Sequence, residues 1–499
     1  MKKPSIQIYI STLVWCLISL YATAQFKEGP TFELTKNPSK YQEYHVIPLL
    51  NEGALVVVEN DHDLGKKYDF WECYSLDTLL QTKWKTNVEV DRFLEIKSTF
   101  KNEHYVFWLF NEAKSKQIAI LRLSLFDGET EWFKAEMPNM MEISGFVVLD
   151  NKAFLAGSDN DKPVLVSFSF FDKSFAYPSG FYDNHFVINS IAADVQENQL
   201  VVILQENRGR NCNLVVKRLS YDNKLLETRT FSNDLTNENY YGLGVYAHFP
   251  NHKKWLVGGV STSCKNKESK GVFVKELDTS LTPIDHLIPY DALPNFFNFM
   301  SSKRQERVKE RIESRKEKGK PTKIDYYTLL HKPLPNDKGG FWLVAEMYYY
   351  SPKYNVNEVN SAFVQKIGTT TLDYHFSHVL VMELDSTGKV LWENSLKVDD
   401  VVTIGATEII QIAKRSSDEL GVAYINDGHI YFQRIKAGKY LENSVLYEVL
   451  DSQTDKIQEN VQFKGFTNNS YLVWAERTIL SKLPNTANTN LFYIKKLSY

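Results

Sequence analysis

Residues 105–132 of this 499-residue chain read YVFWLFNEAKSKQIAILRLSLFDGETEW. The stretch opens on an apolar run at Tyr105, has a second mostly apolar run from Ile118 to Leu123 with Arg122 as its one polar residue, and then reaches Phe126-Asp127. Short apolar runs that end at a turn are typical of β-strands. The aspartate favours a tight turn, because its side chain can accept backbone N–H groups two residues further on. The stretch therefore predicts two strands, a turn, and a further strand that carries Trp132.

The same unit recurs along the chain. Its apolar runs begin at Leu55, Tyr105, Phe154, Leu200, Trp255, Trp342, Leu420 and Tyr471. Successive starts are 50, 49, 46, 55, 87, 78 and 51 residues apart. The matching turns lie at Leu76-Asp77, Phe126-Asp127, Phe171-Asp172, Tyr221-Asp222, Leu277-Asp278 and Leu384-Asp385. A period of roughly 50 residues, interrupted by two insertions, predicts a repeat of four-stranded sheets.

One such sheet cannot bury both of its faces alone, whereas sheets stacked around an axis bury them and leave only short edges. The sequence therefore predicts an all-β chain, a β-propeller of about eight four-stranded blades, although seven blades also fit. Residues 25–499 would form this single domain, with insertions at 291–323 and 348–373. Two β-sandwiches in tandem remain the alternative.

The turn from Leu384 to Trp392 resembles two known propeller patterns. It is similar to the tryptophan-docking repeat of quinoprotein-like propellers, but has one residue fewer between Asp385 and Gly388. It also resembles the Asp-box turn of sialidase-like propellers, without the serine that stands two residues before the aspartate. Both resemblances cover one hairpin per blade, so they imply an architecture and no catalytic residue.

The first 24 residues have the order of a secretory signal peptide: Lys2 and Lys3, a mostly apolar stretch, and Ala22-Thr23-Ala24 before Gln25. Cleavage there predicts a periplasmic or extracellular protein. Without the two lysines the formal charge of -3 becomes about -5, with no dominant sign, so nothing indicates a nucleic-acid partner. No later apolar run predicts a transmembrane anchor in the mature chain.

The sequence contains no nucleophile elbow, zinc-protease helix, Cys-x-x-Cys pair, phosphate loop or dinucleotide fingerprint. We therefore predict no catalytic residue, no cofactor and no metal site. His375 and His378 resemble a ligand pair, but residues three apart on a strand point to opposite faces. Residues 61–63 and 159–161 alternate oxygen ligands as a calcium loop does, yet neither continues into the full motif, which favours plain polar turns.

The first insertion contains the clearest helix, which spans residues 302–318 and ends at Gly319 and Pro321. Between Lys303 and Lys323 there are ten Lys or Arg and four Glu, a local charge of about +6. Such a helix is either a solvent-exposed insertion without a binding role or a docking surface for an anionic partner, made by Arg304, Arg307 and Arg311. The second insertion opens on Tyr348, Tyr349 and Tyr350, which either stack on a glycan or pack beneath a loop.

These features favour a non-catalytic binding or scaffolding propeller that engages a protein or glycan partner through the face with both insertions. A glycan-active propeller enzyme, with carboxylates at the channel mouth, is the alternative. In a four-stranded blade, the connection between blades and the connection from the second to the third strand emerge at the same end. The two insertions are of these two types, so we expect them at one end of the blade that contains Trp342.

Two expectations concern covalent and topological closure. The chain stops at Lys496–Tyr499, where its last blade still lacks an outer strand, and the alternating segment Thr31–Thr35 is the natural donor of that strand. Cys212 and Cys264 lie near equivalent strand connections of neighbouring blades, so we predict a disulfide between them in an oxidising compartment.

Overall fold

The computed structural model describes fifteen segments of the chain. They are residues 26–37, 42–49, 52–60, 67–112, 115–208, 211–232, 240–251, 253–277, 285–355, 369–441, 445–449, 455–457, 461–467, 469–479 and 488–498. The predicted signal peptide, residues 1–24, lies outside the described residues. Within them, no helix is both long and apolar enough to cross a membrane.

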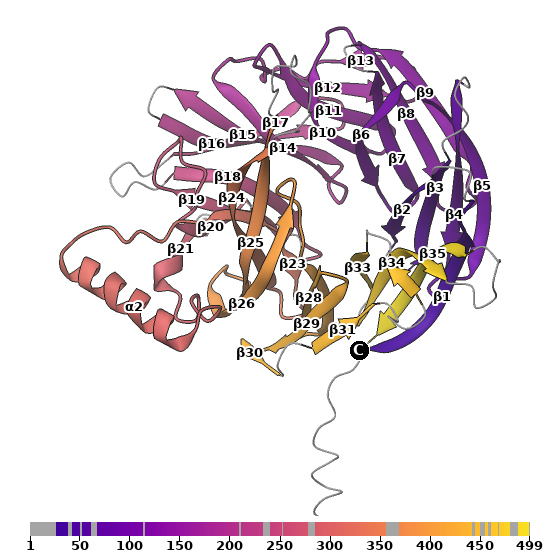
Figure 1. The fold of residues 1–499 in the computed structure, drawn as a ribbon. Coiled ribbons are helices and arrows are strands. Elements are labelled where there is room, and N and C mark those ends of the chain that lie inside the picture. Colours follow the sequence, from indigo (N-terminus) through magenta and orange to yellow (C-terminus); the bar gives the residue numbers. More distant parts are fainter. Residues whose placement is uncertain are drawn as a thin grey trace, which may run out of the picture. The chain divides into compact units, whose positions relative to one another are not determined.

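The strands form eight antiparallel sheets, which we number as blades 1 to 8 in chain order (Figure 1). Blade 1 contains β2 (Gln42–Pro48), β3 (Ala54–Asn60), β4 (Tyr68–Leu76) and β5 (Thr82–Asp91). Blade 2 contains β6 (Leu94–Lys101), β7 (Tyr105–Glu112), β8 (Gln117–Ser124) and β9 (Thr130–Glu136). Blade 3 contains β10 (Glu142–Leu149), β11 (Lys152–Asp159), β12 (Lys162–Ser169) and β13 (Phe175–Ala176). Blade 4 contains β14 (Phe186–Asp194), β15 (Gln199–Arg208), β16 (Asn211–Ser220) and β17 (Leu225–Phe231).

The second half of the chain repeats the pattern. Blade 5 contains β18 (Tyr240–His248), β19 (Lys254–Ser261), β20 (Gly271–Glu276) and β21 (Asp285–Pro289). Blade 6 contains β22 (Tyr327–Leu330), β23 (Leu334–Pro335), β24 (Phe341–Asn355), β25 (Thr369–Leu384) and β26 (Val390–Thr403). Blade 7 contains β27 (Gln411–Ser416), β28 (Glu419–Asn426), β29 (His429–Lys436), β30 (Lys439–Tyr440) and β31 (Val445–Glu448). Blade 8 contains β32 (Asp455–Ile457), β33 (Gln462–Thr467), β34 (Ser470–Ile479), β35 (Thr489–Ser498) and, from the start of the chain, β1 (Lys27–Thr35). The predicted fold class is confirmed: the chain is an eight-bladed β-propeller.

Blade 8 is completed by the start of the chain, as the sequence predicted. Strand β1 pairs antiparallel with β35, with Phe32 opposite Ile494 and Thr35 opposite Leu491, and Figure 1 shows the two strands side by side. The Arg477 side chain adds an ion pair to Glu33 on β1. The two ends of the domain therefore hold each other in one sheet, which leaves β35 no unpaired edge.

Aspartate turns form as predicted at Asp77, Asp127, Asp172 and Asp385. Asp278 lies outside the described residues, and in the turn at Asp222 the Ser220 hydroxyl accepts the backbone N–H of Lys224 instead. The Asp77 carboxylate accepts the backbone N–H of Leu79 at 2.8 Å and that of Gln81 at 2.9 Å. The Asp385 carboxylate does the same for Thr387 at 2.8 Å and Lys389 at 3.0 Å. Each of these two aspartates thus satisfies two N–H groups that no strand partner could reach.

The hydrophobic core lies between consecutive blades. By its internal contacts the chain divides into two compact units, one of residues 1–62, 72–85 and 409–499, and the other of residues 63–71 and 86–408. Within the second unit, apolar clusters join blade 2 to 3, 3 to 4, 4 to 5 and 5 to 6. Within the first, they join blade 7 to 8 and blade 8 to 1. Within each unit, neighbouring blades thus bury apolar faces against one another, as a repeat fold requires.

Both inserted segments belong to blades 5 and 6. A short 3-10 helix, η2 (Tyr290–Ala292), and the helix α2 (Ser302–Glu317) connect β21 to β22, which confirms the predicted helix. The segment expected as a second insertion opens as strand: β24 runs on to Asn355 and β25 begins at Thr369, so they form a long hairpin. Alternating aromatic residues on both strands explain this, because they pack across the pair.

Candidate functional site

Helix α2 ends where the sequence requires it to end. Gly319 adopts a positive φ of +59°, a conformation that glycine reaches without a Cβ penalty. The backbone N–H of Lys320 then donates to the Arg315 carbonyl at 2.9 Å, which caps the last turn. Pro321 follows and cannot continue the helix. The helix is therefore a defined element of 16 residues.

One face of α2 is anchored to the blades. Ile312 is buried and Val308 packs beside it in the cluster between blades 5 and 6. The flanking lysines bond to the connection itself: Lys309 Nζ donates to the Pro294 carbonyl at 3.2 Å, and Lys316 Nζ lies 3.2 Å from Asp291 Oδ2. Positions 308, 309, 312 and 316 share one helix face. Their contacts fix how the rest of the helix is presented.

The three arginines predicted as a docking surface share a different stripe of α2. Arg304, Arg307 and Arg311 are all exposed, and in the part of the chain that the structure describes none of them has a hydrogen bond or an ion pair. Burial raises the pKa of Tyr326, and the positive charge of Arg304 opposes that shift, which places Arg304 close to this tyrosine. We call Arg304, Arg307 and Arg311 the arginine stripe.

The three consecutive tyrosines divide between two faces of the β24–β25 hairpin. The rings of Tyr348 and Tyr350 lie on one face together with Tyr327 of β22 and Tyr374 of β25. The Tyr327 hydroxyl donates to the Tyr350 hydroxyl at 3.1 Å. Sequence reasoning missed Tyr327 and Tyr374, because their place beside the others depends on strand register. These four rings form the tyrosine cluster.

Tyr349 lies on the opposite face of the hairpin. Its ring stacks on the His375 ring, with centroids 4.9 Å apart and planes 5° apart. The His375 Nε2 atom lies 3.0 Å from the Ser351 hydroxyl. Tyr349 and Tyr350 are 53% and 43% exposed, so both faces of the hairpin offer aromatic surface to solvent.

The two insertions emerge at the same end of blade 6, as predicted. The chain leaves α2 and enters β22 at Tyr327, which pairs with Tyr348, at the end of β24 from which the hairpin extends. One residue connects the arginine stripe to the tyrosine cluster. Arg304 acts electrostatically on Tyr326, and Tyr326 directly precedes Tyr327 of the cluster. Among the described residues, no direct bond joins the stripe to Tyr348, Tyr349 or Tyr350.

His378 is a core residue, and the structure separates it from His375. It is fully buried, and its ring stacks on Phe299 with centroids 3.6 Å apart. Its Nδ1 atom lies 2.9 Å from the Ser377 hydroxyl. Burial lowers the pKa of His378 to about 3, so the ring is neutral at physiological pH. The interpretation that the two histidines do not share a metal is therefore supported.

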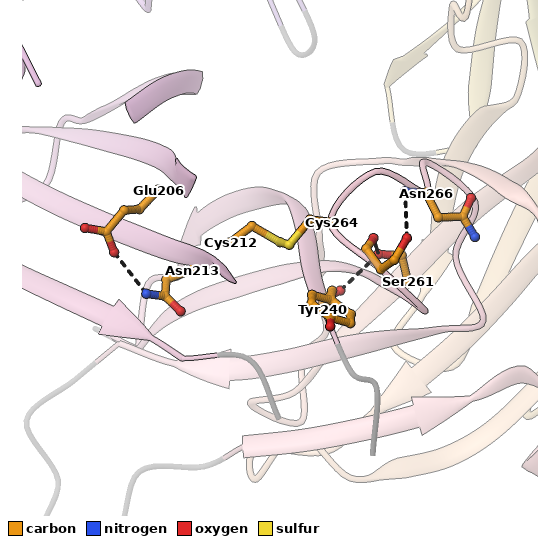
Figure 2. Close-up of a disulfide and its surroundings, with 8 residues drawn as sticks. Glu206, Cys212, Asn213, Tyr240, Ser261, Cys264 and Asn266 are labelled. Carbon is orange, nitrogen blue, oxygen red and sulfur yellow. Dashed lines mark hydrogen bonds between the residues drawn. A yellow bond between two sulfur atoms is a disulfide. The ribbon is translucent and has the colours of Figure 1, made fainter. Parts of the chain in front are cut away.

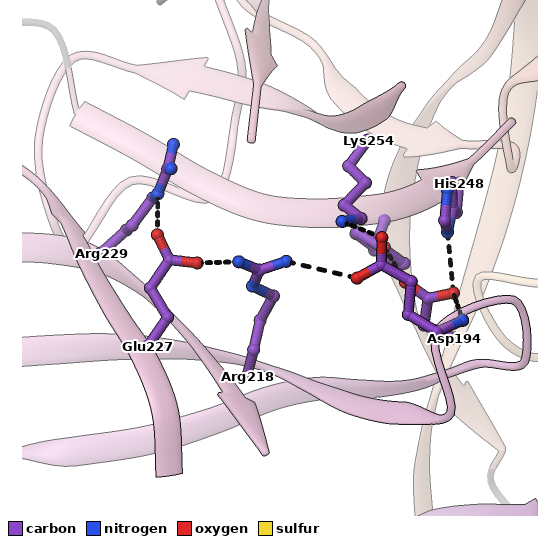
Figure 3. Close-up of polar contacts among 8 residues, drawn as sticks. Asp194, Arg218, Glu227, Arg229, His248 and Lys254 are labelled. Carbon is purple, nitrogen blue, oxygen red and sulfur yellow. Dashed lines mark hydrogen bonds and ion pairs between the residues drawn. The ribbon is translucent and has the colours of Figure 1, made fainter. Parts of the chain in front are cut away.

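Buried carboxylates of the second unit are engaged within the protein. In blades 4 and 5, Asp194 accepts the Tyr246 hydroxyl at 2.6 Å and lies 2.8 Å from His248 Nδ1 (Figure 3). In the same network, Arg218 joins Glu227, and Lys254 lies 2.5 Å from Glu197. Burial and the hydrogen bond to Asp194 both raise the pKa of Tyr246, which keeps it a donor.

Blade 6 shows the same arrangement. Glu346 is buried against His331, and Glu393 accepts the backbone N–H of Asn295 at 2.7 Å. Burial alone would lower the pKa of His331. The hydrogen bond to Glu346 and the negative charge of Glu346 raise the pKa by more than burial lowers it, so the net shift is upward. These carboxylates hold elements in place.

The predicted disulfide is present and joins blades 4 and 5. Cys212 and Cys264 are bonded with their Cα atoms 5.7 Å apart, and Figure 2 shows the bond between the start of β16 and the connection from β19 to β20. Nearby, Asn213 donates to Glu206 at 2.9 Å and the Ser261 hydroxyl donates to the Ser263 carbonyl at 2.9 Å. Cys73 is a buried free thiol.

The structure describes one of the two calcium-like segments. Residues 61–63 lie outside the described residues. Asp159, Asn160 and Asp161 form the tight turn between β11 and β12, where Asn160 and Asp161 both have positive φ. Within the described residues, a group with the spacing of metal ligands occurs elsewhere, at Glu43, His45 and Glu59 of blade 1.

Comparisons with known proteins identify no family for this chain. No family model and no curated protein matches this chain. Among solved structures, a polysaccharide lyase is 8% identical over 81% of this chain and 90% of its own, with a TM-score of 0.37. A prolyl endopeptidase is 9% identical over 87% of this chain and 53% of its own, with a TM-score of 0.40. An apocarotenoid oxygenase variant from Synechocystis is 10% identical over 51% of this chain and 64% of its own, with a TM-score of 0.32. At these values the activities of the three proteins carry no argument for this chain.

Proposed function

We propose that this protein is an exported, non-catalytic binding propeller that captures an anionic protein or acidic glycan through the arginine stripe of α2. The observation that carries the proposal is the division of cations on one helix. Lys309 and Lys316 bond to the protein, whereas Arg304, Arg307 and Arg311 have no bond among the described residues. A guanidinium group can bind a carboxylate, sulfate or phosphate with two parallel hydrogen bonds, which makes arginine well suited to such a partner.

The neighbouring tyrosines extend the same surface. Tyr350 is 43% exposed at the end of blade 6 where α2 joins β22. Exposed tyrosine offers a large apolar face and a polar hydroxyl, which suits protein and glycan partners alike. Long insertions on a rigid scaffold are where binding residues usually gather.

Two further observations support the proposal. The buried carboxylates Asp194 and Glu346 bond to hydroxyl or imidazole groups of the protein, which gives both of them structural roles. The disulfide between Cys212 and Cys264 is compatible with an oxidising compartment.

The test is partner capture from envelope extracts by immobilised protein. We expect the wild type to retain a partner that is released as the salt concentration rises, because exposed charges are screened by salt. The triple variant R304E/R307E/R311E should lose capture while its thermal melt changes little, since none of the replaced side chains has a hydrogen bond or an ion pair among the described residues. Three replacements are needed because a single exposed ion pair contributes only about 0–1 kcal/mol.

A matched control carries the same change in net charge elsewhere. Lys162, Lys173 and Lys224 are exposed on blades 3 and 4, and the variant K162E/K173E/K224E should capture as the wild type does. Undiminished capture by the arginine variant, or equal loss in the control, would contradict the proposal. Mass spectrometry of the retained material, with and without prior glycan removal, identifies the partner class.

A further inference from the structure

Blade 1 presents a set of ligand-type side chains on one face of its edge strand. Gln42 and Asn60 pair across β2 and β3 and hydrogen-bond at 2.6 Å, and Asn60 also donates to Glu72 at 3.1 Å. These side chains mark one face of the sheet. Because successive residues of a strand point to opposite faces, their neighbours Glu43 and Glu59 lie on the other face.

Three of the side chains on that second face converge. Glu43 pairs directly with Glu59 across the two strands, and His45 follows Glu43 at the next position on the same face. The His45 Nε2 atom lies 3.1 Å from Glu59 Oε1 and 3.9 Å from Glu43 Oε1. One ligand atom from each residue lies within 4.8 Å of the others.

This spacing fits a single metal ion. Zinc bonds to histidine nitrogen and carboxylate oxygen at about 2.0–2.2 Å, so the ligand atoms of a tetrahedral site stand roughly 3.4 Å apart. The two separations from His45, 3.1 and 3.9 Å, lie on either side of that value. Small side-chain rotations would bring all three atoms into coordination.

A structural ion pair accounts for this arrangement less well. Like charges directly opposite on antiparallel strands are destabilising, and Glu43 and Glu59 occupy such a pair. One histidine can compensate at most one of them. Neither glutamate has a lysine or arginine partner among the described residues. The nearby Lys85 pairs instead with Glu72, at 2.7 Å, on the opposite face of the blade. A divalent cation would balance both carboxylates.

A buried thiol on the same face is a second, independent observation. Cys73 alternates with Glu72 on β4 and therefore shares the face of Glu59. It is fully buried and has no bonding partner in the described parts of the chain. Cys73 is thus a buried soft group on the same face of the blade as the three converging side chains.

We propose that Glu43, His45 and Glu59 bind a divalent transition-metal ion of the zinc type. One imidazole with two carboxylates suits zinc, manganese or iron better than calcium or magnesium, which prefer all-oxygen sites. The His45, Glu43 and Glu59 side chains are 43%, 55% and 27% exposed, so solvent reaches the site. Three protein ligands leave a position open to water or to an anionic oxygen of a bound molecule. The site lies in blade 1 and does not depend on the function proposed for α2.

The test measures Zn²⁺ binding to the purified, metal-stripped protein by competition with a fluorescent chelator. The wild type should bind one ion per chain. His45→Ala should abolish that binding, and Glu43→Gln and Glu59→Gln should each weaken it at least about tenfold, the scale on which even supporting groups of metal sites act. The two Gln variants keep the shape of the side chain, so a folding defect in the Ala variant does not decide the result.

A matched histidine provides the control. His185 Nδ1 lies 2.6 Å from Asp183, and its side chain is 55% exposed, but among the described residues it forms an ion pair with this one carboxylate only. His185→Ala should bind Zn²⁺ as the wild type does. The thermal melt of the wild type should also rise with added Zn²⁺, because an ion that binds only the folded chain stabilises it. Absence of Zn²⁺ binding in the wild type, or equal affinity in His45→Ala, would overturn the proposal.

Discussion

Reduction of the Cys212–Cys264 disulfide should destabilise the unit that contains blades 4 and 5. The bond closes a loop with a sequence separation of 52 residues. In the chain-entropy model, a loop of that length removes about 14 cal/mol/K from the unfolded state, which corresponds to about 4 kcal/mol at 25 °C. Comparing the oxidised protein with the same protein after reduction isolates the bond, because the packing atoms are otherwise unchanged.

The assay is thermal melting of both forms, with thiol titration after unfolding. The surrounding unit has about 330 residues, for which an unfolding entropy of about 0.7 kcal/mol/K converts the loss into a Tm lower by roughly 6 °C. In protein produced without residues 1–24, which retains three cysteines, Cys73 alone should titrate in the oxidised form, and all three after reduction. Coincident melts of the two forms, or three thiols before reduction, would refute the reasoning.

Three further outcomes follow from the fold. Deletion of residues 25–38 removes β1 from β35 and should lower the Tm sharply, as measured by calorimetry; an unchanged Tm would mean that β1 does not close blade 8. Burial lowers the pKa of His378 to about 3, so the neutral ring contributes its full stability above the pKa of about 6.5 in the unfolded chain, and this contribution is lost as the pH falls. Acidification from pH 7 to 5 should therefore lower the free energy of unfolding by about 2 kcal/mol through this residue, and His378→Leu should lack that part of the pH dependence. His331 has a raised pKa, so its pH dependence has the opposite sign: its pairing with Glu346 stabilises the fold at a pH below the pKa of histidine in the unfolded chain, and less as the pH rises. Glu346→Gln should therefore be more destabilising at pH 6 than at pH 9 in urea unfolding. Equal effects at the two pH values would exclude the charged pair.

Features that repeat or act locally could be predicted from the sequence. The spacing of apolar runs indicated the blades, and aspartate chemistry indicated the turns, because both depend on residues close together in the chain. Gly319 and Pro321 marked the end of α2 for the same reason. The closure by β1 and the end of blade 6 shared by both insertions followed from the antiparallel order of strands once the repeat was recognised.

Features that depend on cross-strand register could not be predicted. Tyr374 joins Tyr350 only because β24 and β25 continue past the length of a typical blade strand. The stacking of His378 on Phe299 requires the connection before α2 to fold back onto blade 6. Glu43 and Glu59 lie opposite each other because of the register in which β2 pairs with β3, and the sequence of either strand alone does not reveal that register.

Arginine footprinting of the captured complex tests the central claim most directly. Phenylglyoxal modifies accessible arginine side chains, and mass spectrometry reports each site. The arginine stripe is exposed in the protein alone, so Arg304, Arg307 and Arg311 should react readily without partner. With the partner bound, all three should be protected while an arginine on another blade, Arg122, keeps its rate. Unchanged reactivity of the stripe in a complex that remains bound would contradict the account.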